Sequence, residues 1–532
     1  MIASFLWVLL GLRWAKLAEH VSQGPARAHG GLGGSRTSTK TTPERDTPMS
    51  QKPMSQTPMS QTPLYDAYRN FLANAGTPFT VPGHKRNPDL IDDFLAFDVP
   101  HYGGVEDRRA STKRLAAAER LAGELWGADW CGFSVQGSSH GNEAICLSLG
   151  KPGDKVIVAR TIHKSLFFGI VLAGLVPVWI RPDLDEQTGL TAGMPVSRVA
   201  DALAQHPDAK AVMLVEPSYV GGVSDVAAHA ELAHAHGIPL TVDAAWGAHL
   251  GFHPDLPPHA IAAGADVLVT SIHKHITGFT QSSMVLAQRE RIDLERLDAA
   301  FEGLHTTSPS GAILASIDLA RALLADRGTE LLDQAIRLAN EARERFRTVP
   351  GLGVVGGEIA DRSPALLMHD PTKIVLTLPG TGADGQLVAD VLEGRGLHLE
   401  FADRDTFCPI ITLADTPQTV DFMVTEIIRA VEEHRGEPRA LVPITAWTLQ
   451  PDTAMTPRDA FFADHERVPA ADAIGRIAAE TAAPYPPGIP ALAPGERISA
   501  TMLAALQAEA KGGTRIAYCG DPMLETVLVV KE

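Results

Sequence analysis

The 532-residue sequence has only four cysteines, which are widely spaced and form no CxxC pair. They suggest neither a disulfide framework nor a zinc knuckle, and they favour a reducing cytoplasm. The chain also lacks a long apolar run, because the segment from Ile2 to Leu12 is too short to span a bilayer and follows no basic region. We interpret this segment as an extended or misassigned start of translation, with a degenerate secretion signal as the alternative.

The sequence has fewer basic than acidic residues. Lysine and arginine number 46 against 63 acidic residues, which gives a formal net charge of -17. The resulting negative potential repels phosphate backbones, so we expect no nucleic-acid partner. A hydrophobic content of 45% with 20% charged residues is ordinary for a globular enzyme, and we expect no membrane association. The length predicts two or three domains of roughly 100 to 200 residues each.

Composition shifts along the chain suggest five segments. Residues 1–63 contain the tandem "PMSQKPMSQTPMSQTP" without periodic apolar positions, and we expect a disordered tail there. Residues 64–111 form an N-terminal segment that opens with the helical pattern "LYDAYRNFLANAG". Residues 112–311 are predicted to be a large domain, 312–436 a smaller α+β domain, and 437–532 a C-terminal domain that follows a proline-rich join.

The large domain alternates short apolar runs with helical patterns such as "VAAHAELAHAHG". The predicted strands are "KVIVA", "VPVWI", "AVMLVEP", "PLTVDAA" and "DVLVTS". Continuous apolar strands separated by helices indicate parallel pairing through right-handed crossovers. The predicted fold class is therefore α/β, with a mainly parallel sheet covered on both faces. Functional residues are expected at the carboxyl ends of its strands.

The strongest candidate site is "VTSIHKHITGFTQSS", where the strand "DVLVT" ends at Ser271 and a loop carries His273 and Lys274. A lysine just past a buried strand can be desolvated, which lowers its pKa and favours Schiff-base chemistry. Taken alone, such a lysine is more often a solvated surface residue.

An acid ends another apolar strand, in "PLTVDAAWGAHLG", where Asp243 follows the run "LTV". A carboxylate there can pair with the protonated pyridine nitrogen of pyridoxal phosphate and keep that ring an effective electron sink. The alternative is an aspartate that caps the next helix.

A Gly/Ser loop in "CGFSVQGSSHGNEAICLSLG" leads into a helix predicted to begin near Asn142. Free backbone N–H groups, serine hydroxyls and a helix N-terminus suit a phosphate monoester, with Ser138, Ser139 and His140 lining it. A plain turn is the alternative. In "RTIHKSLFFG", His163 follows a strand and could stack on the cofactor ring, although an isolated histidine is more often a packed or surface residue.

The histidine-rich stretch "HAELAHAHG" contains His229, His234 and His236 without matching metal-ligand partners, so it is interpreted as a helix surface. We predict no metal site.

The joint order of phosphate-type loop, histidine, aspartate and lysine resembles fold-type I pyridoxal-phosphate enzymes. More narrowly, a set of segments from about Leu64 to the C-terminus resembles the bacterial ornithine/lysine/arginine decarboxylase family. These segments are "VPGHK", "GSSHGN", "HKS", "VDAAWGAH", "SIHK", "FTQSS", "TTSPSGAILASIDLAR" and "YPPGIPALAPGE". The resemblance implies a cofactor-binding large domain, a smaller domain and a C-terminal decarboxylase-family domain. It also implies a homodimer or larger homo-oligomer.

The resemblance further implies a role for each matching residue around pyridoxal 5'-phosphate. Lys274 would be the Schiff-base lysine, Asp243 the partner of the ring nitrogen, and His163 the group stacked on the ring. The phosphate would be held by Ser139, Ser271 and the amides of Ser138 and His140. Trp246 and His249 would lie on the substrate or supporting side, and His273 would orient the lysine.

The implied reaction is decarboxylation of arginine, lysine or ornithine to the corresponding amine and CO2. A carboxylate must then meet the basic head of the substrate, and the candidates are Glu400 and Glu216, each with a structural ion pair as the alternative. Two other functions remain open. One is a different fold-type I enzyme, such as an aminotransferase or lyase, and the other is a catalytically silent regulatory homologue.

Overall fold

The computed structural model describes residues 60–74, 82, 84–85, 96–102, 105–106, 113–440, 444–485 and 488–532. The predicted tail and most of the predicted N-terminal segment therefore lie outside the described residues. Helix α2 (Pro63–Asn74) coincides with the helix predicted from "LYDAYRNFLANAG". In this described part of the chain, no helix combines the length and apolar character that a membrane crossing requires.

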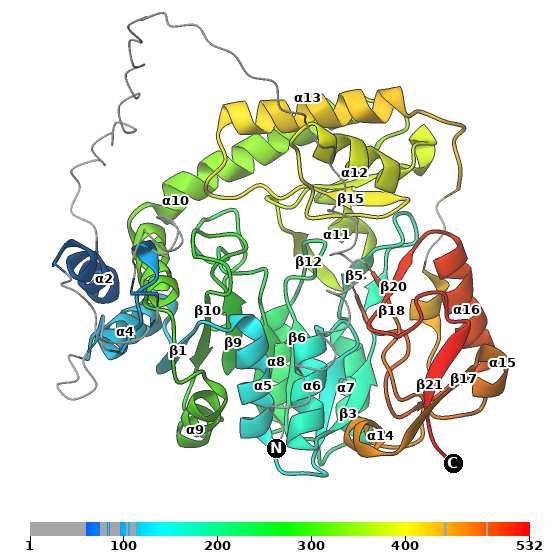
Figure 1. The fold of residues 1–532 in the computed structure, drawn as a ribbon, viewed down its shortest axis with the longest axis horizontal. Coiled ribbons are helices and arrows are strands. Elements are labelled where there is room, and N and C mark those ends of the chain that lie inside the picture. Colours follow the sequence, from blue (N-terminus) through cyan, green and yellow to red (C-terminus); the bar gives the residue numbers. More distant parts are fainter. Residues whose placement is uncertain are drawn as a thin grey trace, which may run out of the picture. The chain divides into compact units, whose positions relative to one another are not determined.

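A seven-stranded sheet forms the centre of the large domain, in the order β1, β10, β9, β8, β6, β2, β3 (Figure 1). Strands β9, β8, β6, β2 and β3 are parallel, whereas β10 pairs antiparallel with both β9 and β1. Their bounds are β1 (Trp130–Ser134), β2 (Lys155–Ala159), β3 (Val176–Ile180), β6 (Val212–Val215), β8 (Leu240–Asp243), β9 (Val267–Ser271) and β10 (Ser283–Ala287). The predicted, mainly parallel α/β sheet is confirmed.

Both faces of this sheet are covered by helices. Successive side chains of a strand point to opposite faces, so in β2 Val156 and Val158 join one apolar cluster while Ile157 and Ala159 join another. The first cluster includes α5, α6 and α9, and the second includes α4, α7, α8 and the first half of α10. Their bounds are α4 (Arg114–Trp126), α5 (Gly137–Leu149), α6 (Lys164–Ala173), α7 (Val196–Gln205), α8 (Val226–Ala235), α9 (Leu294–Leu304) and α10 (Gly311–Arg347).

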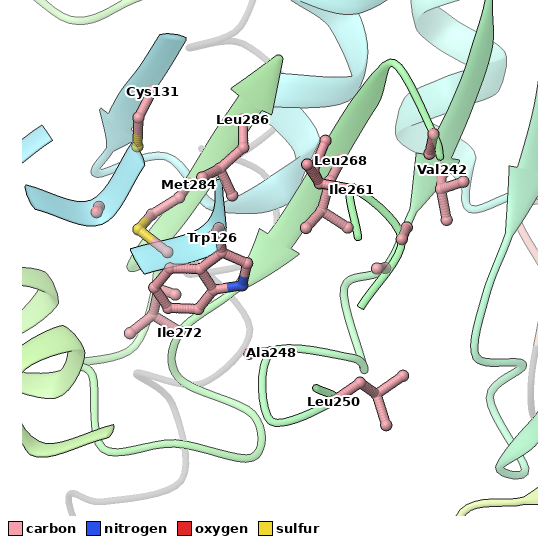
Figure 2. Packing of buried hydrophobic residues seen from close by; sticks show 14 of the residues in the cluster. Trp126, Cys131, Val242, Ala248, Leu250, Ile261, Leu268, Ile272, Met284 and Leu286 are labelled. Atoms are coloured by element: carbon pink, nitrogen blue, oxygen red, sulfur yellow. The ribbon is translucent and has the colours of Figure 1, made fainter. Parts of the chain in front are cut away.

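Figure 2 shows part of the core on the second face, where Trp126 at the end of α4 lies against Met284 and Ile272. The indole is 2% exposed and meets the ring of Phe252 edge-on at 4.9 Å between centroids. Truncating such a buried indole to alanine typically costs about 3–5 kcal/mol. The cluster therefore packs the end of α4 against β10 and against the residue that follows β9.

Helix α5 begins at Gly137, more than a turn before the predicted start near Asn142. Glycine and serine are poor helix formers, but tertiary contacts decide the start here. Gly137 has φ 73° and donates its N–H to the Gln281 carbonyl at 2.8 Å. A Cβ at Gly141 would lie 2.6 Å from methyl groups of Val269 and Val285, so the glycine lets the helix lie close to the sheet.

A second core supports the smaller domain. An antiparallel sheet has the order β11, β13, β15, β14, and α12 and α13 contribute to the same cluster as the second half of α10. The long helix α10 therefore belongs to both cores. The elements are β11 (Gly353–Val355), α11 (Glu358–Arg362), β12 (Leu366–His369), β13 (Val375–Thr377), α12 (Gly385–Gly394), β14 (Phe401–Ala402), β15 (Thr406–Cys408) and α13 (Pro417–Glu433). Strand β12 pairs with β7 (Gly222–Ser224) of the large domain.

The C-terminal part has a cluster of its own and two-stranded pairings of β17 with β21 and β18 with β20. Its main elements are α14 (Pro457–Phe462), β17 (His465–Pro469), β18 (Ala483–Tyr485), α16 (Ala500–Lys511), β20 (Arg515–Ala517) and β21 (Thr526–Val530). A buried ion pair fastens it to the large sheet, because Arg160 after β2 contacts both carboxylate oxygens of Glu496, at 2.5 and 2.9 Å.

Candidate active site

A cavity of about 290 Å³ lies at the carboxyl ends of the parallel strands. Val215, Asp243 and Ser271, the last residues of β6, β8 and β9, all line it. This is where parallel α/β sheets bind ligands. The cavity brings together eight residues predicted from the sequence, which are Ser138, Ser139, His163, Asp243, Trp246, Ser271, His273 and Lys274.

Lys274 follows β9 and presents its amine to this cavity. Its Nζ lies 4.2 Å from the centroid of the Trp246 ring. Burial, reinforced by Lys373, lowers the pKa of Lys274 to about 8, and the Asp243 and Glu400 carboxylates oppose this shift. A substantial fraction of the amine is therefore neutral and nucleophilic near pH 8.

Asp243 is buried at the end of β8 and is held by neutral donors. Asn142 Nδ2 donates to its Oδ2 at 2.7 Å, and the Ala245 N–H donates to its Oδ1 at 3.1 Å. No ion pair to Asp243 is formed among the residues that the structure describes. A buried carboxylate without a basic partner is suited to a cationic ligand group.

Asn142, which fixes Asp243, was not identified from the sequence as a site residue. It lies in α5 within the motif "GSSHGN" and also donates to Ser165 Oγ at 3.0 Å. Both side chains are buried. The motif contains Asn142, but only the packing of α5 against α6 shows that its amide contacts Asp243 and Ser165.

His163 caps α6 and is held in a fixed orientation. Its Nδ1 accepts from the Ser165 N–H at 3.3 Å and lies 2.8 Å from Ser165 Oγ. Burial lowers the pKa of His163, with Asp243 opposing and Lys274 reinforcing the shift. A neutral imidazole held in this way can present its ring face to a flat ligand.

The other end of the cavity offers hydrogen-bond donors to an anion. Ser138 Oγ and Ser271 Oγ are 2.8 Å apart, which links α5 to the end of β9. At the start of α5 the Gln136 N–H is satisfied by Ser134 Oγ and the Gly137 N–H by Gln281. The N–H groups of Ser138 and Ser139 are then the orphan amides of the first turn. Together with the two hydroxyls they suit a phosphate group.

Two predicted histidines turn away from the cavity. His140 lies in the first turn of α5, yet its Nδ1 meets Ser134 Oγ at 2.9 Å and its Nε2 meets the Phe301 carbonyl at 2.8 Å. His249 is buried against Asp370, with its Nε2 2.9 Å from Oδ2. Neither side chain lines the cavity.

The two predicted substrate-side acids have different surroundings. Glu216 is buried, and its Oε2 accepts from the Ser224 N–H at 2.9 Å, so it holds β7 in place. Burial raises the pKa of Glu216 to about 7. Glu400 is exposed and accepts from the Tyr219 hydroxyl at 3.0 Å. Tyr219 lines the cavity, which places Glu400 beside its rim.

A second lysine lies beneath the cavity and was not singled out from the sequence. Lys373 is fully buried, and its Nζ lies 3.5 Å from the centroid of the Trp246 ring. The amines of Lys274 and Lys373 therefore both lie close to the Trp246 indole. Lys373 follows Lys274 by about a hundred positions, so sequence spacing offers no signal that the two amines share one indole.

Among the described residues, His249, His275 and Asp370 are the group with metal-ligand chemistry. A metal ion must lie close to the plane of each imidazole that binds it. The two rings are stacked, with centroids 4.3 Å apart and planes at 27°, so their nitrogen lone pairs do not converge on one ion at bonding distance. Of the predicted surface histidines, His229 is instead buried and bonds the Met194 carbonyl, while His234 pairs with Asp266.

The arrangement fits pyridoxal phosphate. The buried carboxylate of Asp243 lacks a cationic partner, the first turn of α5 offers orphan amides beside serine hydroxyls, and Lys274 supplies an amine with a lowered pKa. These features match the ring nitrogen, phosphate and aldehyde of that cofactor.

The fold is that of fold-type I pyridoxal-phosphate enzymes. A serine palmitoyltransferase from Sphingomonas wittichii superimposes with a TM-score of 0.52 at 14% identity, covering 70% of this chain and 84% of its own. Lysine decarboxylase A from Pseudomonas aeruginosa gives a TM-score of 0.74 at 22% identity, covering 88% of this chain and 80% of its own.

Sequence comparison defines the family. Residues 62–416 match the Orn/Lys/Arg decarboxylase major domain, and residues 444–516 match the C-terminal domain of the same family. An arginine decarboxylase from Bacillus subtilis (strain 168) is 34% identical over 88% of this chain and 98% of its own length. One from Halalkalibacterium halodurans is 35% identical over 85% of this chain and 94% of its own. The chain belongs to the Orn/Lys/Arg decarboxylase family.

Proposed function

We propose that this protein is a pyridoxal-phosphate-dependent decarboxylase that converts arginine to the corresponding amine and CO2. The observation that carries the proposal is that the amine of Lys274 and the unpaired carboxylate of Asp243 face one buried cavity. Membership in the Orn/Lys/Arg decarboxylase family supports a basic amino acid as the substrate. The names of the relatives from Bacillus and Halalkalibacterium support arginine among the three.

In this proposal the chain would hold the cofactor at three points. Asp243 would pair with the ring nitrogen, and Asn142 keeps that carboxylate in place. Ser138, Ser139 and Ser271 would hold the phosphate, and Lys274 would supply the amine for the aldehyde carbon. When bound, the cofactor supplies an electron sink for the pair released as the substrate's carboxylate leaves.

The residues around Lys274 control proton movement. Because the pKa of Lys274 is lowered to about 8, its amine can both accept and release a proton near neutral pH. His273 lines the same cavity, with Nδ1 fixed 2.9 Å from the Ser282 carbonyl, and would orient the Lys274 amine. Ile162, Val215 and Ile489 give apolar walls that exclude water from the reacting atoms.

Substrate selection is assigned to Glu400. A guanidinium needs a carboxylate at the mouth of the site, and Glu400 is joined to the lining residue Tyr219. Glu216 is already engaged with the Ser224 backbone, so it supports the fold rather than the substrate. We further propose a homodimer or larger homo-oligomer in the cytoplasm, in line with the family resemblance.

Product analysis tests this function. The purified protein, supplied with pyridoxal phosphate, is incubated with an equal mixture of arginine, lysine and ornithine. The expected result is CO2 with agmatine in equal amounts. Keto acid formation would identify a different fold-type I reaction. Absence of any product, with a visible cofactor band retained, would identify a silent homologue.

Variants of two lysines connect the activity to the site. Lys274→Ala should abolish both product and the visible cofactor absorbance. Lys210→Ala, at an exposed lysine away from the cavity, should leave both unchanged. Activity that survives Lys274→Ala would contradict the assignment of the covalent lysine.

A further inference from the structure

A second and larger cavity, of about 530 Å³, lies between the outer strand of the large sheet and the C-terminal part of the chain. Strand β3 and the residues after it form one wall, α7 forms another, and Trp447 with Ile489 to Ala491 forms the third. No predicted site residue lines this cavity, and of its side chains the proposed reaction uses only Ile489, as part of an apolar wall. We call it the arginine cavity, after Arg160, Arg181 and Arg198.

Two of the three arginines are neutralised. Arg160 is buried and forms two bonds to the Glu496 carboxylate, and its guanidinium lies 4.9 Å from the Trp179 ring centroid. Arg198 pairs with Asp183 at 2.5 Å and also donates to two backbone carbonyls. Most N–H donors of Arg160 and Arg198 are therefore already hydrogen-bonded within the protein.

Arg181 is the exception. It is half-buried, and its NH1 donates to the Trp447 carbonyl at 3.1 Å. No carboxylate pairs with it in the described part of the chain. Burial, reinforced by the neighbouring Arg160 and Arg198, lowers the pKa of Arg181 to about 10, and Glu496 opposes this shift. A guanidinium that is partly desolvated and lacks a carboxylate partner is stabilised by an added anion.

The remaining lining is suited to more than a bare ion. Val178, Ala202 and Ile489 are apolar, and Trp447 presents an indole whose Nε1 is already bonded to the Ile489 carbonyl at 3.2 Å. Two acids also line the cavity. Asp183 is paired with Arg198, and Asp201 is exposed, so it disfavours an anion at the rim. A volume of this size exceeds what a phosphate or carboxylate group occupies alone.

We propose that the arginine cavity binds a small organic anion, whose phosphate or carboxylate group is held by Arg181 and whose organic part lies against Trp447 and Ala202. The two oxyanions share the same recognition, because a guanidinium matches both in bidentate geometry. The site adjoins the active site, since Thr191 and Ile489 line both cavities.

Calorimetric titration of the full-length protein, with excess pyridoxal phosphate removed, tests the proposal. The probes are inorganic phosphate, glycerol phosphate and succinate at constant ionic strength, because salt screens exposed charge. Glycerol phosphate and succinate distinguish a phosphate ligand from a carboxylate ligand. If phosphate binds instead in the active-site cavity, near Ser138 and Ser271, its affinity should not change when Arg181 is replaced.

Two variants remove the site in different ways. Arg181→Gln removes the cation, and Gln205→Trp fills the cavity from α7 while leaving every arginine in place. Each should weaken binding of the preferred organic anion at least tenfold. Arg337→Gln, at an exposed arginine of α10 paired with Glu341, is the matched control and should leave binding unchanged.

The proposal is overturned if none of the three probes binds the unaltered protein at tens of millimolar. It is also overturned if the folded Gln205→Trp variant binds glycerol phosphate and succinate as the unaltered protein does. Because that variant keeps the contact of Arg181 with Trp447, it decides the matter even if Arg181→Gln fails to fold.

Discussion

Replacing Lys373 with methionine should raise the pKa of Lys274, because the substitution removes a buried positive charge beside it. The two amine nitrogens lie 3.5 and 4.2 Å from the centroid of the same Trp246 ring, so they are no farther apart than the sum of these distances. Lys373 is among the groups that lower the pKa of Lys274. Burial lowers the pKa of Lys373, whereas Cys408, Asp370 and Glu400 oppose this shift and the short distance to the indole favours the charged form through a cation–π interaction.

The expected shift follows from this separation. Two unit charges this far apart repel by on the order of 2 kcal/mol at an effective dielectric constant of about 20. That energy corresponds to about 1.5 pH units, which would move the pKa of Lys274 from about 8 to about 9.5. At pH 8 the neutral fraction of the amine would then fall from about one half to about 3%.

The assay is the rate at which the cofactor-free protein bonds covalently to pyridoxal phosphate, followed by visible absorbance as a function of pH. The midpoint of the rate profile should rise in Lys373→Met and stay in place in Lys210→Met, at an exposed lysine. Methionine preserves most of the side-chain volume, and Asp370 keeps its bonds to His249 and Thr372, so the variant should fold. An unchanged midpoint in a folded variant would show that Lys373 is neutral and would refute the reasoning.

Three further predictions concern stability and substrate binding. The folded pKa of Lys274 lies below its ordinary 10.5, so burial of this lysine costs stability below about pH 8, and the cost fades as the pH rises towards 10.5. Lys274→Met should therefore stabilise the cofactor-free protein by about 1–3 kcal/mol at pH 7 and by little at pH 11. Urea unfolding at the two pH values measures the difference. Arg160→Gln should leave the buried Glu496 carboxylate without its cationic partner, still accepting from the Ala493 N–H, and should cost about 3–5 kcal/mol; an unchanged melting temperature would contradict this view of the pair. Glu400→Gln should raise the KM for arginine about tenfold with little change in kcat, whereas Glu393→Gln, at an exposed acid of α12, should change neither.

The residues that a strand delivers to the site could be predicted from the sequence. Asp243 and Ser271 end apolar runs, and Lys274 and His163 follow such runs within a few positions. Parallel strands place their carboxyl ends at one edge of a sheet, so a local pattern is enough to bring these residues together. The same reasoning predicted the strands themselves, because continuous apolar runs are needed where both faces are buried.

Only the tertiary structure decided where side chains point and which distant segments meet. His140 was placed in the cavity by its neighbours in the motif, but α5 starts at Gly137, and the helical turn directs that imidazole towards Phe301. Asn142 meets Asp243 because α5 lies close against the sheet at Gly141. Lys373 and the arginine cavity depend on contacts between segments far apart in sequence. No local period encodes such contacts, since they form only when separate cores pack together.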